Sequence, residues 1–405
     1  MAKYNYDKSI LKGLGVSDFL NEVKVREAHI AEGENTIPTS IYNPNIVSSK
    51  LHPACQFAKV AEVIDRKDGK TYVLEPNKDM GTEKLAYFRA GQYVSVICEF
   101  DNQFMCRPYS ICSNPKDALT KGTYEITIKE VANGLASSYI LNNWKQGSEV
   151  TLSGPLGNFY YERLRDRKTV VALAGGSGIT PFLAMARSIA EGIEDFNLTI
   201  LYGSRSEADI LLKAELDEVV NKANGKVKVV HVLSEEENSN YEHGFITAEL
   251  IKKYAPEDYS IFVCGPKAMY KFLVGEIAKL NLPKRKVRFE LAGEYGDPTA
   301  DEKYPKDAAK KEFKVRVHYR DEFKDITCKS EQTLLRAIEA AGIKVTSDCR
   351  SGECGWCHSR LINGNVYIPE SADGRRLADK KFGWIHPCAT YPLSDIEMEV
   401  FPITK

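Results

Sequence analysis

The chain has 405 residues, which is too long for one ordinary domain and suits roughly two to four. Its hydrophobic content of 43%, charged content of 27% and formal net charge of -1 describe a globular protein that is not basic enough to bind nucleic acid. No run of about eighteen apolar residues is present, so we expect no membrane span. The N-terminus lacks a secretory signal pattern, and we therefore expect a cytoplasmic protein.

Residues 1–50 differ in pattern from the chain that follows. Apolar residues recur at helical spacing between Asp7 and His29, and Pro38, Pro44 and neighbouring asparagines then predict irregular chain. We interpret this part as an N-terminal extension. It is either packed on the next domain or a docking arm for a partner.

Residues 51–164 have the pattern of a β domain. Short alternating runs, such as residues 93–97 and 124–129, are separated by turn residues. One helical segment, residues 135–144, interrupts them. Many short strands at regular intervals predict a small antiparallel β-barrel.

Two short motifs of this domain suit a phosphorylated ring cofactor. The first, Arg-Pro-Tyr-Ser at residues 107–110, offers an arginine for phosphate, a tyrosine to cover a flat ring and a serine to hydrogen-bond a ring edge. The second, Asn-Gly-Leu-Ala-Ser at residues 133–137, begins the predicted helix and leaves backbone N–H groups for a pyrophosphate. Taken alone, the first motif is equally typical of a turn followed by a strand.

Residues 165–295 alternate between strands and helices. Continuous apolar strands are separated by helical segments, and this predicts a doubly wound parallel sheet with helices on both faces. The strands are expected at residues 169–174, 198–202, 227–232 and 261–264, with helices such as residues 181–191 and 208–221.

The first of these strands runs into a glycine-rich turn, Gly-Gly-Ser-Gly-Ile-Thr-Pro at residues 175–181. Glycine permits close approach of a phosphate, and proline suits the first helical turn. The turn is not the G-x-G-x-x-G fingerprint. Further on, Cys-Gly-Pro at residues 264–266 ends a strand on the side where open α/β sheets bind ligands. Taken alone, Cys264 is also typical of a small buried hydrophobic residue.

Residues 296–311 are polar and irregular, and we interpret them as an interdomain linker. The remaining residues, 312–405, predict a compact α+β domain, because a hairpin, one helix and returning strands follow one another. The strands are expected at residues 313–319, 323–329, 360–368 and 396–401, and the helix at residues 331–341.

Four of the ten cysteines gather in this last domain, and the other six are scattered, which suits reduced thiols rather than disulfides. Within residues 348–358, called the cluster loop below, Cys349, Cys354 and Cys357 have four and then two residues between them, and Cys388 is remote. This is the spacing of plant-type [2Fe-2S] ferredoxins. A zinc site is the alternative, because the loop contains a C-x2-C pair.

Together these motifs, with Leu-Tyr-Gly-Ser-Arg at residues 201–205, resemble the ferredoxin-NADP reductase superfamily. With its C-terminal cluster the chain looks most like reductase components of multicomponent oxygenases, such as those of phenylacetyl-CoA epoxidase and 3-ketosteroid hydroxylase. The resemblance implies an FAD-binding β-barrel domain at residues 51–164 and an NAD(P)-binding domain at residues 165–295. It also implies a β-grasp [2Fe-2S] ferredoxin domain at residues 312–405.

The resemblance also implies roles for individual residues. Arg107 would bind the flavin phosphates, Tyr109 would pack on the isoalloxazine, and Ser110 would hydrogen-bond near its N5 atom. Ser110, Cys264 and Glu290 would act at the reacting atoms, and Ala292 stands where relatives often carry an aromatic residue. The implied contacts with FAD and the nicotinamide nucleotide are Arg107, Tyr109, Ser110, Gly134, Leu135, Ala136, Ser137, Gly175, Gly176, Gly178, Thr180, Arg205, Gly265 and Pro266; the implied iron ligands are Cys349, Cys354, Cys357 and Cys388.

The implied function is electron transfer from NADH or NADPH through FAD to the [2Fe-2S] cluster and on to a separate acceptor protein, a terminal oxygenase or another redox protein. The alternatives are a reductase for a non-oxygenase acceptor, including an anaerobic one, the reverse reaction toward NAD(P), and a redox sensor. Arg205 suits a 2′-phosphate, and the sequence shows no acidic residue placed to bind the free ribose hydroxyls. The same arginine occurs in NADH-using relatives, and we favour NADH.

Overall fold

The computed structural model describes residues 15–32, 42–100, 103–131, 135–290, 293, 296–319 and 322–401. The chain divides into two compact units, Met1–Lys50 and Leu51–Lys405. Helix α1 spans Val16–Glu32, so the predicted helix is present there, and its first part lies outside the described residues. The prediction of irregular chain around Pro44 is wrong: α2 spans Asn43–Leu51, because proline is tolerated in the first turn of a helix.

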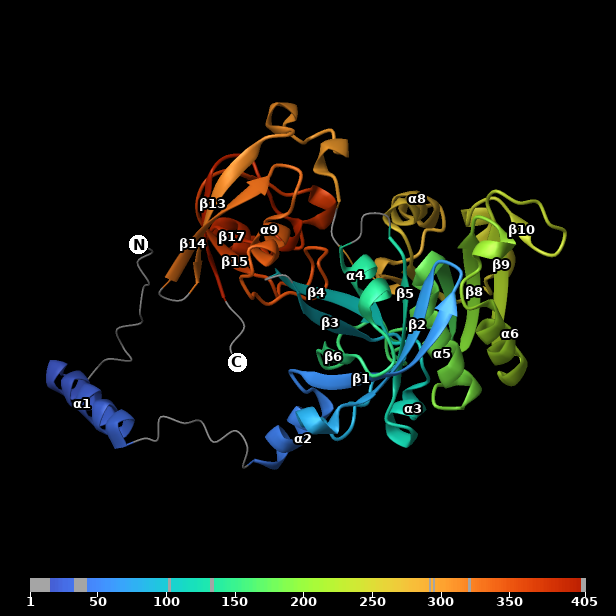
Figure 1. Ribbon diagram of the computed structural model, residues 1–405, viewed down its shortest axis with the longest axis horizontal. Coiled ribbons are helices and arrows are strands. Elements are labelled where there is room, and N and C mark those ends of the chain that lie inside the picture. The colour runs from blue at the N-terminus through green and yellow to red at the C-terminus, as the bar shows by residue number, and fades with distance from the viewer. Residues whose placement is uncertain are drawn as a thin grey trace. The chain divides into compact units, whose positions relative to one another are not determined.

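The second unit begins with an antiparallel barrel (Figure 1). Its strands are ordered β4-β3-β6-β1-β2-β5, and a bridge between Ile111 and Ile126 joins the two ends of the sheet. The predicted barrel is confirmed, but a second helix, α3, was missed: Asn114 caps it by accepting from the Lys116 N–H. The elements are β1 (Gln56–Arg66), β2 (Gly69–Pro76), β3 (Tyr93–Phe100), β4 (Gln103–Ser110), α3 (Pro115–Thr120), β5 (Tyr124–Lys129), α4 (Leu135–Asn143) and β6 (Glu149–Leu152).

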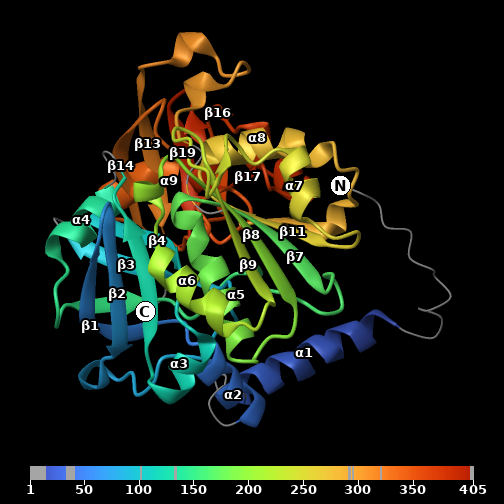
Figure 2. The same cartoon turned by 90° about the vertical axis from the view of Figure 1, so that its right-hand side faces the viewer.

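A parallel sheet of six strands follows, ordered β10-β9-β8-β7-β11-β12. Figure 2 shows α5 and α6 on one side of it and α7 and α8 on the other, as the doubly wound prediction requires. The elements are β7 (Thr169–Gly175), α5 (Thr180–Ala190), β8 (Asn197–Ser204), α6 (Lys213–Lys222), β9 (Val227–Leu233), β10 (Glu242–His243), α7 (Ala248–Tyr254), β11 (Ser260–Cys264), α8 (Lys267–Ala278) and β12 (Val287–Phe289).

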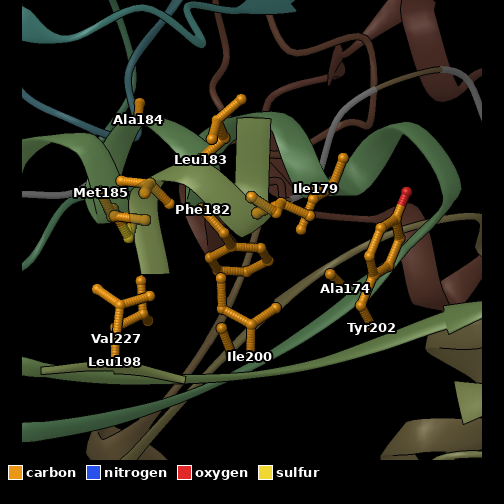
Figure 3. Close-up of a cluster of buried hydrophobic side chains, with 14 of the residues drawn as sticks. Ala174, Ile179, Phe182, Leu183, Ala184, Met185, Leu198, Ile200, Tyr202 and Val227 are labelled. Carbon is orange, nitrogen blue, oxygen red and sulfur yellow. The ribbon is translucent and has the colours of Figure 1, made fainter. Parts of the chain in front are cut away.

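Alternate residues of the central strand β7 pack into two different cores. Ala172 belongs to the core under α5 and α6, where Phe182 points toward Ile200 (Figure 3). Leu173 belongs to the core under α7 and α8. Successive side chains of a strand point to opposite faces, so an apolar run is needed where both faces are covered.

The helix predicted at residues 208–221 starts later than expected. Residues 207–209 form a single 3-10 turn, and Leu212 then takes a left-handed φ of 59° before α6 begins. A residue in this left-handed region interrupts the right-handed helical path, so residues 207–221 do not form one continuous helix. The displaced turn leaves Asp209 at the edge of the sheet rather than inside a helix.

The last domain has a five-stranded sheet ordered β14-β13-β19-β15-β17, in which β13 and β19 are parallel and the other pairs antiparallel. This mixed sheet, with one helix packed on it, is the predicted β-grasp arrangement. The helix begins three residues later than predicted, because the Thr333 side chain accepts from the Arg336 N–H and caps it there. The elements are β13 (Glu312–Tyr319), β14 (Glu322–Lys329), α9 (Leu334–Ala340), β15 (Ser359–Asn363), β16 (Val366–Tyr367), α10 (Leu377–Lys381), β17 (Trp384–Ile385), β18 (Tyr391–Pro392) and β19 (Ile396–Val400).

Residues 296–311, interpreted as a linker from the sequence, pack on this last domain. Tyr304 is 2% exposed, and its hydroxyl donates to the Ser330 carbonyl over 3.2 Å. Its ring also meets Tyr367 edge to face at 5.1 Å. In the described part of the chain, no helix has the length and apolar character needed to cross a membrane.

Candidate functional site

The four predicted iron ligands lie in the last domain as two pairs. The Cys354 N–H donates to Cys349 Sγ over 3.4 Å, and the Sγ atoms of Cys357 and Cys388 are 3.4 Å apart. A hydrogen bond from the Cys354 thiol lowers the pKa of Cys349 to about 4, which favours the thiolate, the form that binds metals. Two pairs of thiols suit a cluster of two irons held by four cysteines.

The backbone of the cluster loop also fits a buried cluster. Gly352 has a left-handed φ of 86°, and a Cβ there would lie 2.0 Å from the Ala372 carbonyl oxygen, so only glycine fits. His386 Nδ1 donates to the Gly352 carbonyl over 2.6 Å. The other neighbouring histidine, His358, stacks on Trp384 at 4.3 Å between ring centres. Both histidines that a zinc site would use therefore have other partners.

A buried arginine fastens this loop to the helix beneath it. The side chain of Arg350 is 0% exposed, and its two terminal nitrogens donate to the Glu339 carboxylate over 2.6 and 2.9 Å. Arg107 of the barrel also reaches this carboxylate, at 3.4 Å. Helix α9, which carries Glu339, lies beside β4, which carries Arg107 (Figure 1). One carboxylate thus joins the cluster loop, α9 and the barrel.

The first residue of the cluster loop lies directly on the barrel. Asp348 accepts hydrogen bonds from the Tyr93 hydroxyl at 2.8 Å and the Ser95 hydroxyl at 3.1 Å. Burial raises the pKa of Asp348, and these two donors oppose that rise. Tyr93 is paired with Ser110 between β3 and β4. The loop and the Arg-Pro-Tyr-Ser motif therefore meet across one strand pair.

The motif residues of the barrel lie at the end of β4. Arg107, Tyr109 and Ser110 are half-buried, whereas residues 104–106 of the same strand are buried. Burial raises the pKa of Tyr109, which keeps its hydroxyl protonated. Helix α4 begins at Leu135, as predicted, and it shares the barrel core with β4. An arginine and a helix N-terminus are the groups that a dinucleotide phosphate needs.

The structure describes Ala136 and Ser137 of the predicted helix start, whereas two other predicted positions lie outside the described residues. The Ser137 hydroxyl accepts from the Val131 N–H over 3.3 Å, and Ala136 packs in the barrel core. Gly134 and Ala292 lie outside the described residues.

Cys264 and Glu290 come together at the carboxyl edge of the parallel sheet. Burial raises the pKa of Cys264, and the charge of Glu290 adds to the rise. The Tyr270 hydroxyl accepts from the Gly265 N–H at 3.1 Å and donates to the Glu290 carbonyl at 2.5 Å. A Cβ on Gly178 would lie 2.1 Å from the Cys264 carbonyl oxygen, so the glycine-rich turn packs directly on this strand end.

Glu290 also faces the cluster loop. Burial raises the pKa of its carboxyl to about 8, and the nearby charges of Asp348 and Cys349 contribute to the rise. The Gly293 N–H donates to the Cys349 carbonyl over 3.0 Å. The strand end that carries Cys264 and the loop that carries the thiols therefore meet at Glu290.

The raised pKa of Glu290 predicts a pH-dependent stability. From its ordinary value of 4.5 up to about 8, the folded protein keeps this proton and the unfolded chain does not. The free energy of unfolding should therefore fall as the pH rises through this window, by about 2–5 kcal/mol. Denaturant unfolding at about pH 5 and pH 8 should show this fall, and Glu290→Gln should reduce it. An equal fall in the wild type and in Glu290→Gln would contradict the assignment of this pH dependence to Glu290.

A cavity of about 660 Å³ opens at the same edge of the sheet. Gly175, Gly176, Arg205 and Pro266 line it, as expected of nucleotide contacts, whereas Gly178 and Thr180 are buried and do not belong to its lining. A Cβ on Gly175 would lie 2.4 Å from Met269 Sδ and 3.0 Å from Pro266 Cδ, so glycine leaves room for these two side chains at the floor of the cavity. No motif in the sequence indicated the other wall residues, which include Lys129, Asp209, Glu235, Phe245 and Phe272.

Three families match separate parts of the chain. Residues 69–161 match the oxidoreductase FAD-binding domain, residues 172–274 the oxidoreductase NAD-binding domain, and residues 318–393 the 2Fe-2S iron-sulfur cluster binding domain. The residues described above fit these groups: an arginine and a helix start for FAD, a glycine-floored cavity for the nucleotide, and paired thiols for iron.

Several curated proteins are similar over most of their length. The glycine betaine monooxygenase reductase subunit of Chromohalobacter salexigens is 25% identical over 78% of this chain and 88% of its own. The 3-ketosteroid-9-alpha-monooxygenase ferredoxin reductase component of Rhodococcus rhodochrous is 28% identical over 77% and 87%. One subunit of the 1,2-phenylacetyl-CoA epoxidase of Escherichia coli is 24% identical over 77% and 88%.

Among solved structures, phthalate dioxygenase reductase has the same fold, with a TM-score of 0.60, 23% identity and coverage of 86% of this chain and 98% of that one. The layout of barrel, parallel sheet and β-grasp domain is therefore the fold of that reductase. The matched domains and relatives support the resemblance to the ferredoxin-NADP reductase superfamily, and the chain is an NAD(P)H-dependent oxidoreductase with FAD-binding, NAD-binding and 2Fe-2S cluster binding domains.

Proposed function

We propose that the protein passes electrons from the nicotinamide nucleotide through FAD and the cluster to a terminal oxygenase. The observation that carries this proposal is the meeting of three sites. Glu290 contacts the strand end of Cys264 on one side and approaches the cluster loop on the other, and Tyr93 joins that loop to Ser110. Short distances between successive sites are what electron transfer through bound cofactors requires.

Each part of the chain has a separate task in this proposal. Arg107, Tyr109 and Ser110 hold and orient FAD, and the glycine-rich turn and Cys264 bring the nicotinamide against it. When bound, FAD accepts an electron pair and releases electrons singly to the iron-sulfur cluster. Burial raises the pKa of Glu290 to about 8, which favours its protonated form at neutral pH in the region where electrons arrive.

The relatives support an oxygenase as the acceptor, since two of them are named as reductase parts of monooxygenases and a third as part of an epoxidase. We also propose the cytoplasm as the compartment, because the six cysteines outside the proposed cluster form no disulfide in the structure. The N-terminal extension, residues 1–50, remains a proposed docking arm or packing segment.

Anaerobic mixing of the holoprotein with NADH tests the proposed order. The flavin absorbance should bleach first and the cluster absorbance second. Steady reduction of cytochrome c should follow under excess NADH. A cluster that is reduced without prior flavin reduction would contradict the order, and a flavin that stays oxidised would favour a sensor.

The proposed exit for electrons is the exposed side of the cluster loop. Cys354 is the exposed cysteine of the four, and Trp356, two residues on, is 57% exposed. Aromatic side chains at such places often dominate a protein contact. Transfer from the cluster to a protein acceptor should therefore depend on Trp356.

Replacing Trp356 by alanine should raise the KM for cytochrome c by about tenfold, as expected for loss of a contact worth about 1–2 kcal/mol. Reduction of ferricyanide, a small acceptor, should stay unchanged. Phe323→Ala is the matched control, since Phe323 is 58% exposed but lies on the edge strand β14. An equal effect in both variants would exclude the loop as the exit.

A further inference from the structure

The last two strands of the parallel sheet part at the level of Cys264 and Glu290. Along β11 and β12 the residues pair in parallel register, up to the pair of Val263 and Phe289. The Glu290 N–H still donates to the Val263 carbonyl over 2.9 Å. A regular parallel ladder would continue with one more bond, from the Gly265 N–H to the Glu290 carbonyl. In the described chain this backbone bond is absent, so the ladder stops one bond early.

A tyrosine hydroxyl takes the place of the missing bond. The Tyr270 hydroxyl accepts from the Gly265 N–H over 3.1 Å and donates to the Glu290 carbonyl over 2.5 Å. Both backbone groups thus keep a partner, as backbone groups shielded from water require. An oxygen atom now lies between the two strands where a direct bond would otherwise join them. The hydroxyl is therefore a spacer between β11 and β12 at this level.

The spacer is held in place by its own helix and by the neighbouring strand. Helix α8 begins at Lys267, and the Tyr270 N–H donates to the Pro266 carbonyl over 3.2 Å in the first turn. The Tyr270 ring packs on Phe289 of β12, with 5.9 Å between the ring centres. Burial raises the pKa of Tyr270, and the charge of Cys264 adds to the rise, so the hydroxyl keeps its proton at neutral pH. The hydroxyl can therefore donate and accept at the same time.

The residues on either side of the spacer are two that we expect at the reacting atoms. Cys264 ends β11 and Glu290 directly follows β12, so the separation of these strands sets the separation of the two residues. Burial raises the pKa of the Cys264 thiol, and a hydrogen bond with the Tyr270 hydroxyl opposes this rise, so the hydroxyl also reaches the thiol. Tyr270 does not line the nucleotide cavity in the part of the chain that the structure describes. It acts through its neighbours.

We propose that Tyr270 is a positioning residue for hydride transfer, because its hydroxyl sets the distance between Cys264 and Glu290 where the nicotinamide meets the flavin. In this step a hydride leaves nicotinamide C4 with its electron pair and forms the N–H bond at flavin N5. The nicotinamide is oxidised, the flavin is reduced, and Tyr270 neither gains nor loses a proton. Such a step depends steeply on the placement of the reacting atoms, since a displacement of about 1 Å can cost about 100-fold in rate. This inference rests on the proposed function, because it concerns the nicotinamide site of that function.

The test uses full-length holoproteins. Tyr270→Phe removes one oxygen atom and keeps the ring that packs on Phe289. Tyr254→Phe is the matched control, because Tyr254 belongs to the same domain, its hydroxyl donates to the Glu242 carboxylate, and it does not line the nucleotide cavity in the described chain.

Three quantities are compared with the wild type. The first is the rate constant of flavin reduction at saturating NADH, measured by anaerobic stopped flow. The second is the primary deuterium isotope effect on this rate constant, with NADH deuterated at the transferred position. The third is the dissociation constant of NAD⁺, measured by calorimetry on the oxidised protein.

Tyr270→Phe should lower the rate constant of flavin reduction by about tenfold, as expected for a displacement smaller than about 1 Å. The isotope effect should be at least as large as in the wild type, because the slowed step is hydride transfer itself. The dissociation constant of NAD⁺ should change by less than about twofold, since the lost interaction does not contribute to uniform binding. Tyr254→Phe should leave all three quantities within about twofold of the wild type.

Three results would overturn the inference while the proposed function stands. They are a wild-type rate constant in Tyr270→Phe, the absence of an isotope effect on its slowed step, and a loss of NAD⁺ affinity as large as the loss of rate. A Tyr270→Phe protein that no longer holds FAD would assign the hydroxyl to the stability of the fold and would overturn the inference as well. By contrast, a wild-type flavin that NADH does not reduce would refute the proposed function, and the inference with it.

Discussion

A Cys354→Ser variant is expected to keep NADH-dependent reduction of ferricyanide and to lose reduction of cytochrome c by more than about 100-fold. Replacing residues that only hydrogen-bond the metal ligands already lowers metal affinity or activity by about 10–100-fold. Cys354 is itself a predicted ligand, so its loss should have a larger effect. Serine is close in size, but its oxygen is a poor substitute for the soft thiolate that iron-sulfur clusters use. The cores of the barrel and the parallel sheet do not include this loop, so hydride transfer to FAD should continue.

Visible circular dichroism should report the lost or altered cluster in the same samples. Cys55→Ser is the control, because Cys55 is exposed as well but lies at the start of the barrel. Parallel loss of both activities would refute the order in which the cluster follows the flavin. Retention of cytochrome c reduction would show that FAD reduces proteins directly.

Replacing Glu339 by alanine should lower the free energy of unfolding of the ferredoxin domain by about 3–5 kcal/mol. The change leaves the fully buried guanidinium of Arg350 without the carboxylate that now lies 2.6 Å away. It also removes the contact of α9 with Arg107, so the domain should separate more readily from the barrel. Urea unfolding followed by the visible absorbance of the cluster measures the change.

Two further variants test how much the buried ion pair of Arg350 and Glu339 contributes to stability. Asp325→Ala breaks an exposed pair of the same domain, in which Arg316 and Asp325 are 2.7 Å apart, and should cost at most about 1 kcal/mol. The double variant Glu339→Leu with Arg350→Met removes both charges and should recover most of the stability. A Glu339→Ala loss no larger than that of Asp325→Ala would show that the buried pair contributes little.

Strand positions followed closely from the sequence, whereas the starts of two helices did not. The run predicted at residues 124–129 is strand β5, since alternation along a strand is a local property. Helices α6 and α9 begin later than their apolar spacing predicts. Their starts depend on a left-handed Leu212 and on the capping side chain of Thr333, neither of which alters the spacing.

The absence of an acidic residue near Arg205 was a misleading prediction from the sequence. Asp209 lies four positions further on, at the 3-10 turn of residues 207–209, and its Oδ2 lies 3.3 Å from Arg205 Nε. Its second partner, Lys67, is 142 residues away in the chain. No sequence pattern around Lys67 or around Asp209 indicates that these two residues form an ion pair.

By itself, the sequence determined the class of fold, the cofactors and the candidate iron ligands. Strand alternation, glycine-rich turns and cysteine spacing are patterns of a few neighbouring residues, so they can be recognised without the tertiary structure. Only the tertiary structure decided which of these groups meet. Tyr93 lies 255 residues from Asp348, and Arg107 lies 232 residues from Glu339. Such contacts depend on how the sheets of different domains pack together, and the proposed electron path rests on them.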